Sequence, residues 1–192
     1  RIRDSFIVDH SPATLTVTAG TPTQTKVVLS SNEAAANAIV YASCMVQDKY
    51  GNDIQGLATQ IDAVEDLTIS GQNISATRAG TYLVTCSITD FDAPLDRTPA
   101  SLVVIPAAPA SLEIVATPDK SRYLINDTVE LSFVVKDAFE NDVLGVMASW
   151  TTPGNGVNVS PAGIGLTVTF LQEGAYTFHA ALADTSTISG TR

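Results

Sequence analysis

An internal repeat limits the fold of this chain more than any other feature of its sequence. The segment 43–54, SCMVQDKYGNDI, returns 89 residues later as 132–143, SFVVKDAFENDV. Two shorter matches follow at spacings of 94 and 97 residues, respectively: Ala79–Tyr82 with Glu173–Tyr176, and Pro12–Leu15 with Pro109–Leu112. Matches at nearly constant spacing indicate two tandem copies of one fold, each about 95 residues long.

The limits of the two copies do not coincide with the limits of the chain. We expect a leading segment at 1–11, module 1 at 12–106 and module 2 at 107–192. The short linker Pro106–Pro109 joins the modules, and its two prolines predict a stiff, extended connection.

The sequence predicts a closing strand for module 1 but not for module 2. Module 1 ends in a strand-like run, Ser101–Val104, whereas the last residues of module 2, Ser189–Arg192, resemble residues 94–97. Module 2 is therefore expected to lack its closing strand. A spare strand-like run occurs in the leading segment, where the closing strand of a preceding module would lie: Ser5, Phe6, Ile7 and Val8.

Short runs of alternating apolar and polar residues predict strands throughout both modules. Turn-forming clusters separate these runs by about 8 to 15 residues, a spacing typical of a β-sandwich. One stretch, Asn32–Asn37, could form a helix but is too short for more than one turn. Clear strand candidates in both modules include Leu15–Thr18, Lys26–Ser30, Ala38–Val46, Thr81–Ile88, Ser111–Ala116 and Thr128–Val135.

Composition and charge argue against several classes of partner. The net charge is −10 with only ten Lys and Arg residues, whereas nucleic acids and anionic membrane surfaces require clustered cations. No apolar run approaches the roughly 18 residues of a membrane-spanning helix.

The two cysteines, Cys44 and Cys86, both belong to module 1 and both lie in alternating strand patterns. Cys44 shares one strand face with Ala42 and Val46, while Cys86 shares one with Val84. If these faces meet across a sandwich, the thiols either pair or remain as two buried free thiols.

Three motifs give the chain a family resemblance. They are the Asp-x-x-Gly-Asn turn at Asp48–Asn52, the Gly-x-Tyr start of a late strand at Gly80 and Gly174, and the Pro-Ala-x-Leu opening. With these motifs the chain resembles the bacterial Ig-like modules of adhesins and invasin-type surface proteins; filamin-type repeats are a weaker alternative. The resemblance implies an all-β fold of two tandem Ig-like antiparallel β-sandwiches.

The same resemblance implies roles for individual residues. It favours a disulfide between Cys44 and Cys86, and hence an oxidising, extracellular location. The Gly-x-Tyr segments resemble tyrosine corners. Trp150, the counterpart of Ile61, is expected inside module 2, where module 1 has its cysteines.

No arrangement of residues indicates an enzyme. His10 and His179 occupy non-equivalent positions without a neighbouring nucleophile or a zinc-binding spacing. Acidic loops at one end of module 2 offer Asp137, Asp142 and Asp184 as candidate Ca²⁺ ligands, with ordinary polar loops as the alternative. No other cofactor is expected.

These observations favour a structural protein of the cell surface: an adhesin, stalk or filament segment. Its partners would be neighbouring Ig-like modules or copies of itself. Insertion of Ser5–Val8 into module 2 of a neighbouring molecule would produce a head-to-tail filament by β-strand exchange. The same pattern of spare and missing strands is expected if the sequence is a segment of a longer array of such modules. The alternatives are a carbohydrate-binding accessory module of a secreted hydrolase and a decoration protein of a viral particle.

Overall fold

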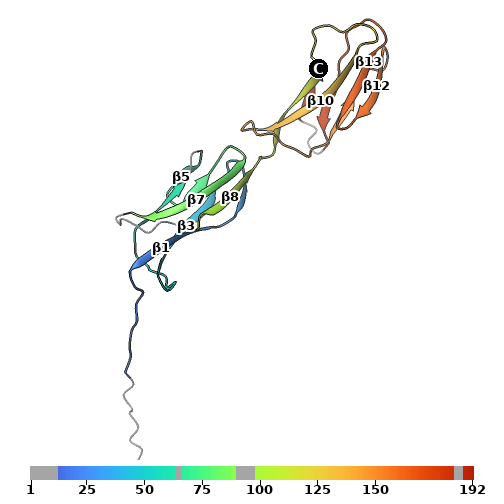
Figure 1. Ribbon diagram of the computed structural model, residues 1–192. Coiled ribbons are helices and arrows are strands. Elements are labelled where there is room, and N and C mark those ends of the chain that lie inside the picture. Colours follow the sequence, from blue (N-terminus) through green and yellow to red (C-terminus); the bar gives the residue numbers. More distant parts are fainter. Residues whose placement is uncertain (1–12, 64–65, 90–97, 184–187) are drawn as a thin grey trace, which may run out of the picture.

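The computed structural model describes residues 13–63, 66–89, 98–183 and 188–192. All the secondary-structure elements formed by these residues are β-strands (Figure 1). The described residues therefore contain no helix long and apolar enough to cross a membrane. The strands form two modules joined by the linker 106–108, as the all-β, two-module prediction required.

Module 1 consists of two four-stranded sheets that face each other. The first sheet has the order β1 (Pro22–Leu29), β3 (Val40–Asp48), β6 (Asn73–Ser75) and β5 (Thr68–Ser70). The second has the order β2 (Glu33–Ala35), β8 (Ala100–Ile105), β7 (Gly80–Ile88) and β4 (Thr59–Ala63). Alternate residues of β7 are buried between the sheets, because successive side chains of a strand point to opposite faces.

Module 2 repeats this arrangement with fewer strands among the described residues. Its first sheet has the order β12 (Val157–Ala162), β13 (Gly165–Phe170), β10 (Thr128–Asp137) and β9 (Pro109–Thr117). Its second sheet has the order β11 (Ala148–Thr151), β14 (His179–Leu182) and β15 (Ser189–Thr191). Each module has its own buried apolar core.

The short stretch Asn32–Asn37 is not the single turn of helix that its composition allowed. Its central residues form β2, which pairs with the closing strand β8. This pairing is parallel, unlike the other strand pairs of the described structure. Tertiary pairing with β8 therefore overrides the local preference of a segment too short to be a stable helix.

The opening strand of module 1 starts ten residues later than the sequence match indicated. Pro22 of β1 lies opposite Asp48, as Pro109 of β9 lies opposite Asp137. Pro22, 87 residues before Pro109, is thus the counterpart of that proline, and the match of Pro12 to Pro109 is wrong. Residues 13–20 belong to no strand.

Among the described residues, the closing strand of module 2 is represented only by its first position. β15 pairs with β14 at the counterparts of residues 85–87, just before the place where β8 pairs with β7. Phe178 and Arg192 continue this pairing with two backbone hydrogen bonds of 2.9 and 3.0 Å, at the place that Val84 and Ala100 hold in module 1. The sequence match of Ser189–Arg192 to residues 94–97 was therefore out of register. The spare run Ser5–Val8 lies outside the described residues.

Candidate functional site: the junction between the modules

The turn that follows β10 is organised by one buried carboxylate, Asp137. Its Oδ1 accepts hydrogen bonds from the backbone N–H groups of Phe139 (2.8 Å) and Asn141 (2.9 Å). Its Oδ2 accepts one from Asn141 Nδ2 (2.8 Å) and one from the backbone N–H of Ala107 in the linker (2.8 Å). Glu140 adopts a left-handed backbone conformation with a φ of 66°. Its counterpart in module 1 is Gly51, which adopts a positive φ without a steric penalty.

These hydrogen bonds set the acidity of the carboxyl group. Burial raises the pKa of Asp137, but the hydrogen bonds from Asn141, Ala107 and Phe139 outweigh burial and lower this pKa to about 2. The group is ionised at neutral pH and holds the linker against the turn.

The same turn contacts module 1. Asn141 donates from Nδ2 to the carbonyl oxygen of Thr77 (2.7 Å) and accepts at Oδ1 from the N–H of Ala79 (2.8 Å). Phe139 packs against the buried core of module 1. The turn Asp137–Asn141, which we name the junction turn, therefore fixes module 2 to the end of module 1 (Figure 1).

Module 1 contains a second copy of this turn at Asp48–Asn52. Asp48 accepts from the N–H groups of Tyr50 (2.8 Å) and Asn52 (3.0 Å), from Asn52 Nδ2 (2.9 Å) and from the N–H of Gly20 (2.9 Å). The Asn52 side chain and these backbone donors lower the pKa of Asp48. Gly20 thus takes the place of Ala107. Tyr50, the counterpart of Phe139, is 77% exposed.

The tyrosine corners expected from the Gly-x-Tyr segments are confirmed. Tyr82 donates its hydroxyl hydrogen to the carbonyl oxygen of Arg78 (2.8 Å). Tyr176 does the same to Gln172 (2.9 Å). This corner in module 1 lies directly beside Thr77 and Ala79, so it shapes the surface on which the junction turn docks.

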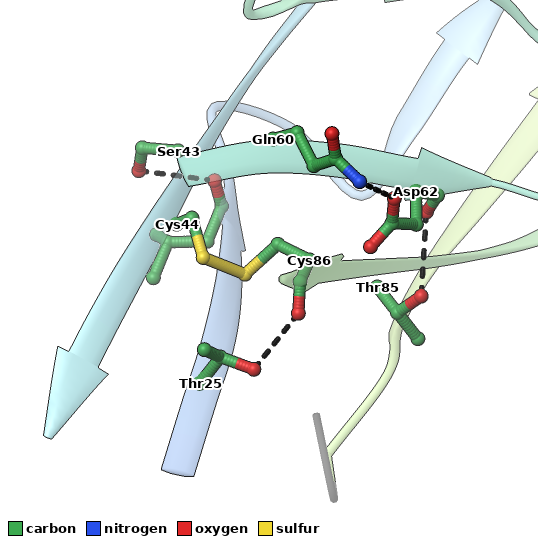
Figure 2. Close-up of a disulfide and its surroundings, with 8 residues drawn as sticks. Thr25, Ser43, Cys44, Gln60, Asp62, Thr85 and Cys86 are labelled. Carbon is green, nitrogen blue, oxygen red and sulfur yellow. Dashed lines mark hydrogen bonds between the residues drawn. A yellow bond between two sulfur atoms is a disulfide. The ribbon is translucent and has the colours of Figure 1, made fainter. Parts of the chain in front are cut away.

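A disulfide joins Cys44 of β3 to Cys86 of β7, and so links the two sheets of module 1 (Figure 2). The hydroxyl of the buried Thr25 donates to the carbonyl oxygen of Cys86 (2.8 Å), which brings β1 to the same point. Figure 2 also shows a hydrogen bond between the neighbouring strands β7 and β4, in which the hydroxyl of Thr85 donates to the carbonyl oxygen of Asp62 (3.4 Å).

Module 2 fills the corresponding space with aromatic rings. Phe133 and Ala180 occupy the places of Cys44 and Cys86, as the strand registers of the two modules show. The ring of Phe133 lies 6.2 Å from that of Trp150. Trp150 is partly buried and packs against this core, as expected from its equivalence to Ile61.

The residues considered for calcium do not gather as a metal site in the described chain. Four N–H groups already surround the Asp137 carboxylate, so this residue anchors a turn. The backbone of Asp142 forms an isolated antiparallel β-bridge with Lys136. Asp184 lies outside the described residues. No group of three His, Cys, Asp or Glu side chains suited to a metal occurs among the residues that the structure covers. Calcium binding stays a prediction.

Module 2 has a groove of about 950 Å³ at the end remote from the linker. One wall consists of residues 120–125, which follow β9, and the other of residues 172–178, which precede β14. Four aromatic side chains line it: Tyr123, Phe170, Tyr176 and Phe178.

Comparisons with known proteins bear on the fold. No known protein family and no curated protein matches the sequence. Among solved structures, the chain resembles the Escherichia coli adhesin FdeC, with 20% identity over 90% of this chain and 64% of that chain, and a TM-score of 0.53. It also resembles invasin, a bacterial integrin-binding protein, with 17% identity over 87% of this chain and 39% of that chain, and a TM-score of 0.55.

A third similar structure is InvD of Yersinia pseudotuberculosis, with 13% identity over 87% of this chain and 56% of that chain, and a TM-score of 0.50. The chain thus spans less than two thirds of each of these proteins. At such identities the likeness establishes the fold, and the chain is a pair of tandem Ig-like β-sandwiches of the kind found in bacterial adhesins.

Proposed function

We propose that this chain is a structural segment of an extracellular surface protein of the adhesin kind, in which Ig-like modules are stacked end to end. The observation that carries the proposal is the junction. Three features hold module 2 on module 1: a linker of three residues that donates one hydrogen bond to Asp137, two hydrogen bonds between Asn141 and module 1, and the packing of Phe139. Such a junction keeps a tandem array extended, and an extended array holds a binding region away from the cell.

The disulfide supports an extracellular location, because disulfides persist in oxidising compartments. The adhesin structures that resemble this chain support the same assignment through their fold.

Small-angle X-ray scattering tests the structural role. At concentrations at which the chain is monomeric, the wild type is expected to scatter as one rigid, elongated particle. The double variant Phe139→Ala and Asn141→Ala removes the junction contacts and should produce a broader distribution of dimensions. The matched control is Tyr50→Ala with Asn52→Ala, which changes the equivalent turn of module 1 and should leave the distribution unchanged. A wild-type chain that already scatters as two freely jointed modules would contradict the proposal.

A second function is favoured by the groove of module 2: self-association head to tail by β-strand exchange. The groove exposes apolar and aromatic side chains at the end of module 2 remote from the linker. Exposed apolar surface beside an incompletely paired strand is a typical acceptor for an added strand.

A further inference from the structure

The outward face of the first sheet of module 1 differs in chemistry from the rest of this acidic protein. Alternate side chains of a strand share a face, and the buried residues of β1 and β3 identify the inward set. The outward set of β1, β3, β6 and β5, which we name the amide face, consists of amides, hydroxyls, one aromatic ring and two apolar side chains. These described strands place no Asp or Glu on the amide face, although the chain has 20 acidic residues, and Lys26 is its one charged side chain.

Tyr41 lies near the centre of the amide face. It belongs to the inner strand β3, lies opposite Asn73 of β6 and is 47% exposed. Its backbone N–H donates to Ser30 Oγ (3.0 Å), and its hydroxyl donates to Gln72 Oε1. These bonds fix the ring. The amide nitrogens of Gln72 and Asn73 donate to no residue that the structure describes, so their hydrogens are available beside the ring.

Two further amides are fixed at the other end of β3. Gln24 donates from Nε2 to Gln47 Oε1 (2.9 Å), and Gln47 donates from Nε2 to Asp53 Oδ1 (2.9 Å). Each amide has two N–H donors and an oxygen with two lone pairs, so this chain of bonds leaves donors and acceptors unused. The polar groups of the amide face are therefore oriented before any ligand arrives.

A recess of about 200 Å³ opens beside the middle of β3, between residues 43–46 and the crossover segment 53–57. The backbone groups of an antiparallel strand alternate in direction, so those of Cys44 point away from β1, as those of Ala42 and Val46 do. Ala42 bonds to the β5–β6 hairpin there, and Val46 bonds to the crossover segment. Within the described chain, the N–H and C=O of Cys44 have no such partner, so both face the gap between the hairpin and the crossover segment.

The same gap is filled in module 2. The β5–β6 hairpin turns at residues 71–72, whereas the β12–β13 hairpin turns at residues 163–164 and reaches two residues further along its neighbour. Ile164 therefore comes opposite Phe133, the counterpart of Cys44, and its carbonyl oxygen accepts a hydrogen bond from Trp150 Nε1 (3.3 Å). The fold does not require the gap, so module 1 can use it to hold a ligand.

The outward face of module 2 also lacks the chemistry of the amide face. The strand registers place Glu130 where module 1 has Tyr41, and Lys136 where module 1 has Gln47. Charged side chains at these places are typical of a solvated surface. The aromatic ring and the fixed amides thus belong to module 1 alone.

We propose that the amide face and its recess bind a neutral carbohydrate chain. A polyol without charge matches a face of amides and hydroxyls, because it offers both donors and acceptors and needs no counter-charge. The ring of Tyr41 supplies an apolar surface for the C–H face of a sugar. The outward residues of β3 from Tyr41 to Gln47 extend over about 20 Å, so several sugar units can lie along the strand.

The structure assigns a role to each group. Gln72 and Asn73 donate to sugar hydroxyls beside the Tyr41 ring, and the backbone of Cys44 pairs with a hydroxyl that enters the recess. The net charge of −10 disfavours anionic ligands. This binding function is additional to the stacking of modules and does not depend on it.

An array of neutral and anionic oligosaccharides tests the proposal on the full chain. The wild type should bind neutral members, and its binding should be the same at about 0.05 and 0.5 M salt, because no ion pair contributes. Tyr41→Ala should bind the same glycans at least roughly tenfold more weakly. The matched variant Glu130→Ala, at the equivalent place of module 2, should bind like the wild type.

Nuclear magnetic resonance locates the bound glycan. Adding the glycan that binds most tightly on the array should shift the backbone amide signals of Cys44 and Asn73, and leave those of Phe133 and Thr167 unchanged. Tyr41→Phe keeps the ring and should retain most of the affinity. Unchanged melting temperatures of the Tyr41 variants would show that a loss of binding is not a loss of folding.

Four outcomes overturn the proposal: no neutral glycan bound, Tyr41→Ala binding like the wild type, signal shifts confined to another surface, or binding limited to anionic glycans and lost at high salt. None of them affects the proposed structural role, which scattering measures separately.

Discussion

At the scale of single residues, Asp137 and Asn141 are the most consequential side chains of the described structure. Its place in an acidic loop made Asp137 a candidate calcium ligand, with an ordinary polar loop as the alternative; in the structure its oxygens accept hydrogen bonds from N–H groups of the turn and of the linker. The reach of Asn141 to module 1 could not be read from the sequence, because the turn motif alone does not show what lies beyond it. The repetition of the turn at Asp48–Asn52 was the available signal of a structural role.

Replacing Asn141 by Ala should lower the stability of the pair more than replacing Asn52 by Ala. Both changes remove a hydrogen bond to the aspartate of the turn. Only Asn141→Ala also removes the bonds to Thr77 and Ala79, together about 1–3 kcal/mol. Denaturant unfolding of both variants measures the difference. Equal losses would mean that the junction bonds contribute no stability.

The stability of module 2 should fall in acid through Asp137. The pKa of this group is lowered from 3.8 to about 2 on folding, so the folded state favours the ionised form. The resulting stability is complete above pH 3.8 and is lost as the pH falls towards about 2. Unfolding curves of wild type and Asp137→Asn across this range should converge at the acid end. Parallel curves would contradict the assignment.

At the scale of elements, the sequence predicted most strands and both tyrosine corners, because alternation and turn residues are local signals. It misplaced the opening strand of module 1, since Leu15–Thr18 alternates as well as β1 does. Alternation reveals that a strand buries one face, but it does not reveal which module supplies the core. The hydrogen-bonded register of Pro22 with Asp48 resolves this point.

Removing the disulfide should destabilise module 1 alone. The double variant Cys44→Ala and Cys86→Ala frees a loop closed at a sequence separation of 42, which should cost roughly 4 kcal/mol in the chain-entropy view. Calorimetry should show a lower melting temperature for module 1 and an unchanged transition for module 2. Reduction of the wild type by dithiothreitol should reproduce the shift. An unchanged module 1 transition would show that the bridge is dispensable.

At the scale of the whole molecule, the junction couples the stabilities of the two modules. The side chains that cross the junction, Phe139 and Asn141, come from module 2 and cover module 1. The linker bond of Ala107 to Asp137, by contrast, belongs to module 2 and its own linker. The crossing contacts are lost whichever module unfolds, so they stabilise both modules by the same free energy.

Separating the modules should reveal this coupling. Module 1 alone, residues 13–108, is expected to melt roughly 5–10 °C below its transition in the pair, since it loses the Phe139 packing and two hydrogen bonds. Module 2 with its linker, residues 106–192, loses the same contacts and should also melt at a lower temperature. Differential scanning calorimetry of the three proteins measures both shifts, and an unchanged transition of either separated module would contradict the expectation.

The disulfide also determines how far each module lengthens when the chain is pulled. Cys44 and Cys86 are separated by 42 residues in the sequence. The disulfide therefore prevents roughly 150 Å of backbone from extending when module 1 unfolds under tension. Phe133 and Ala180 impose no such restriction on module 2. A single oxidised molecule stretched between two supports should therefore extend in two unequal steps, and on reduction the shorter step should lengthen by that withheld amount.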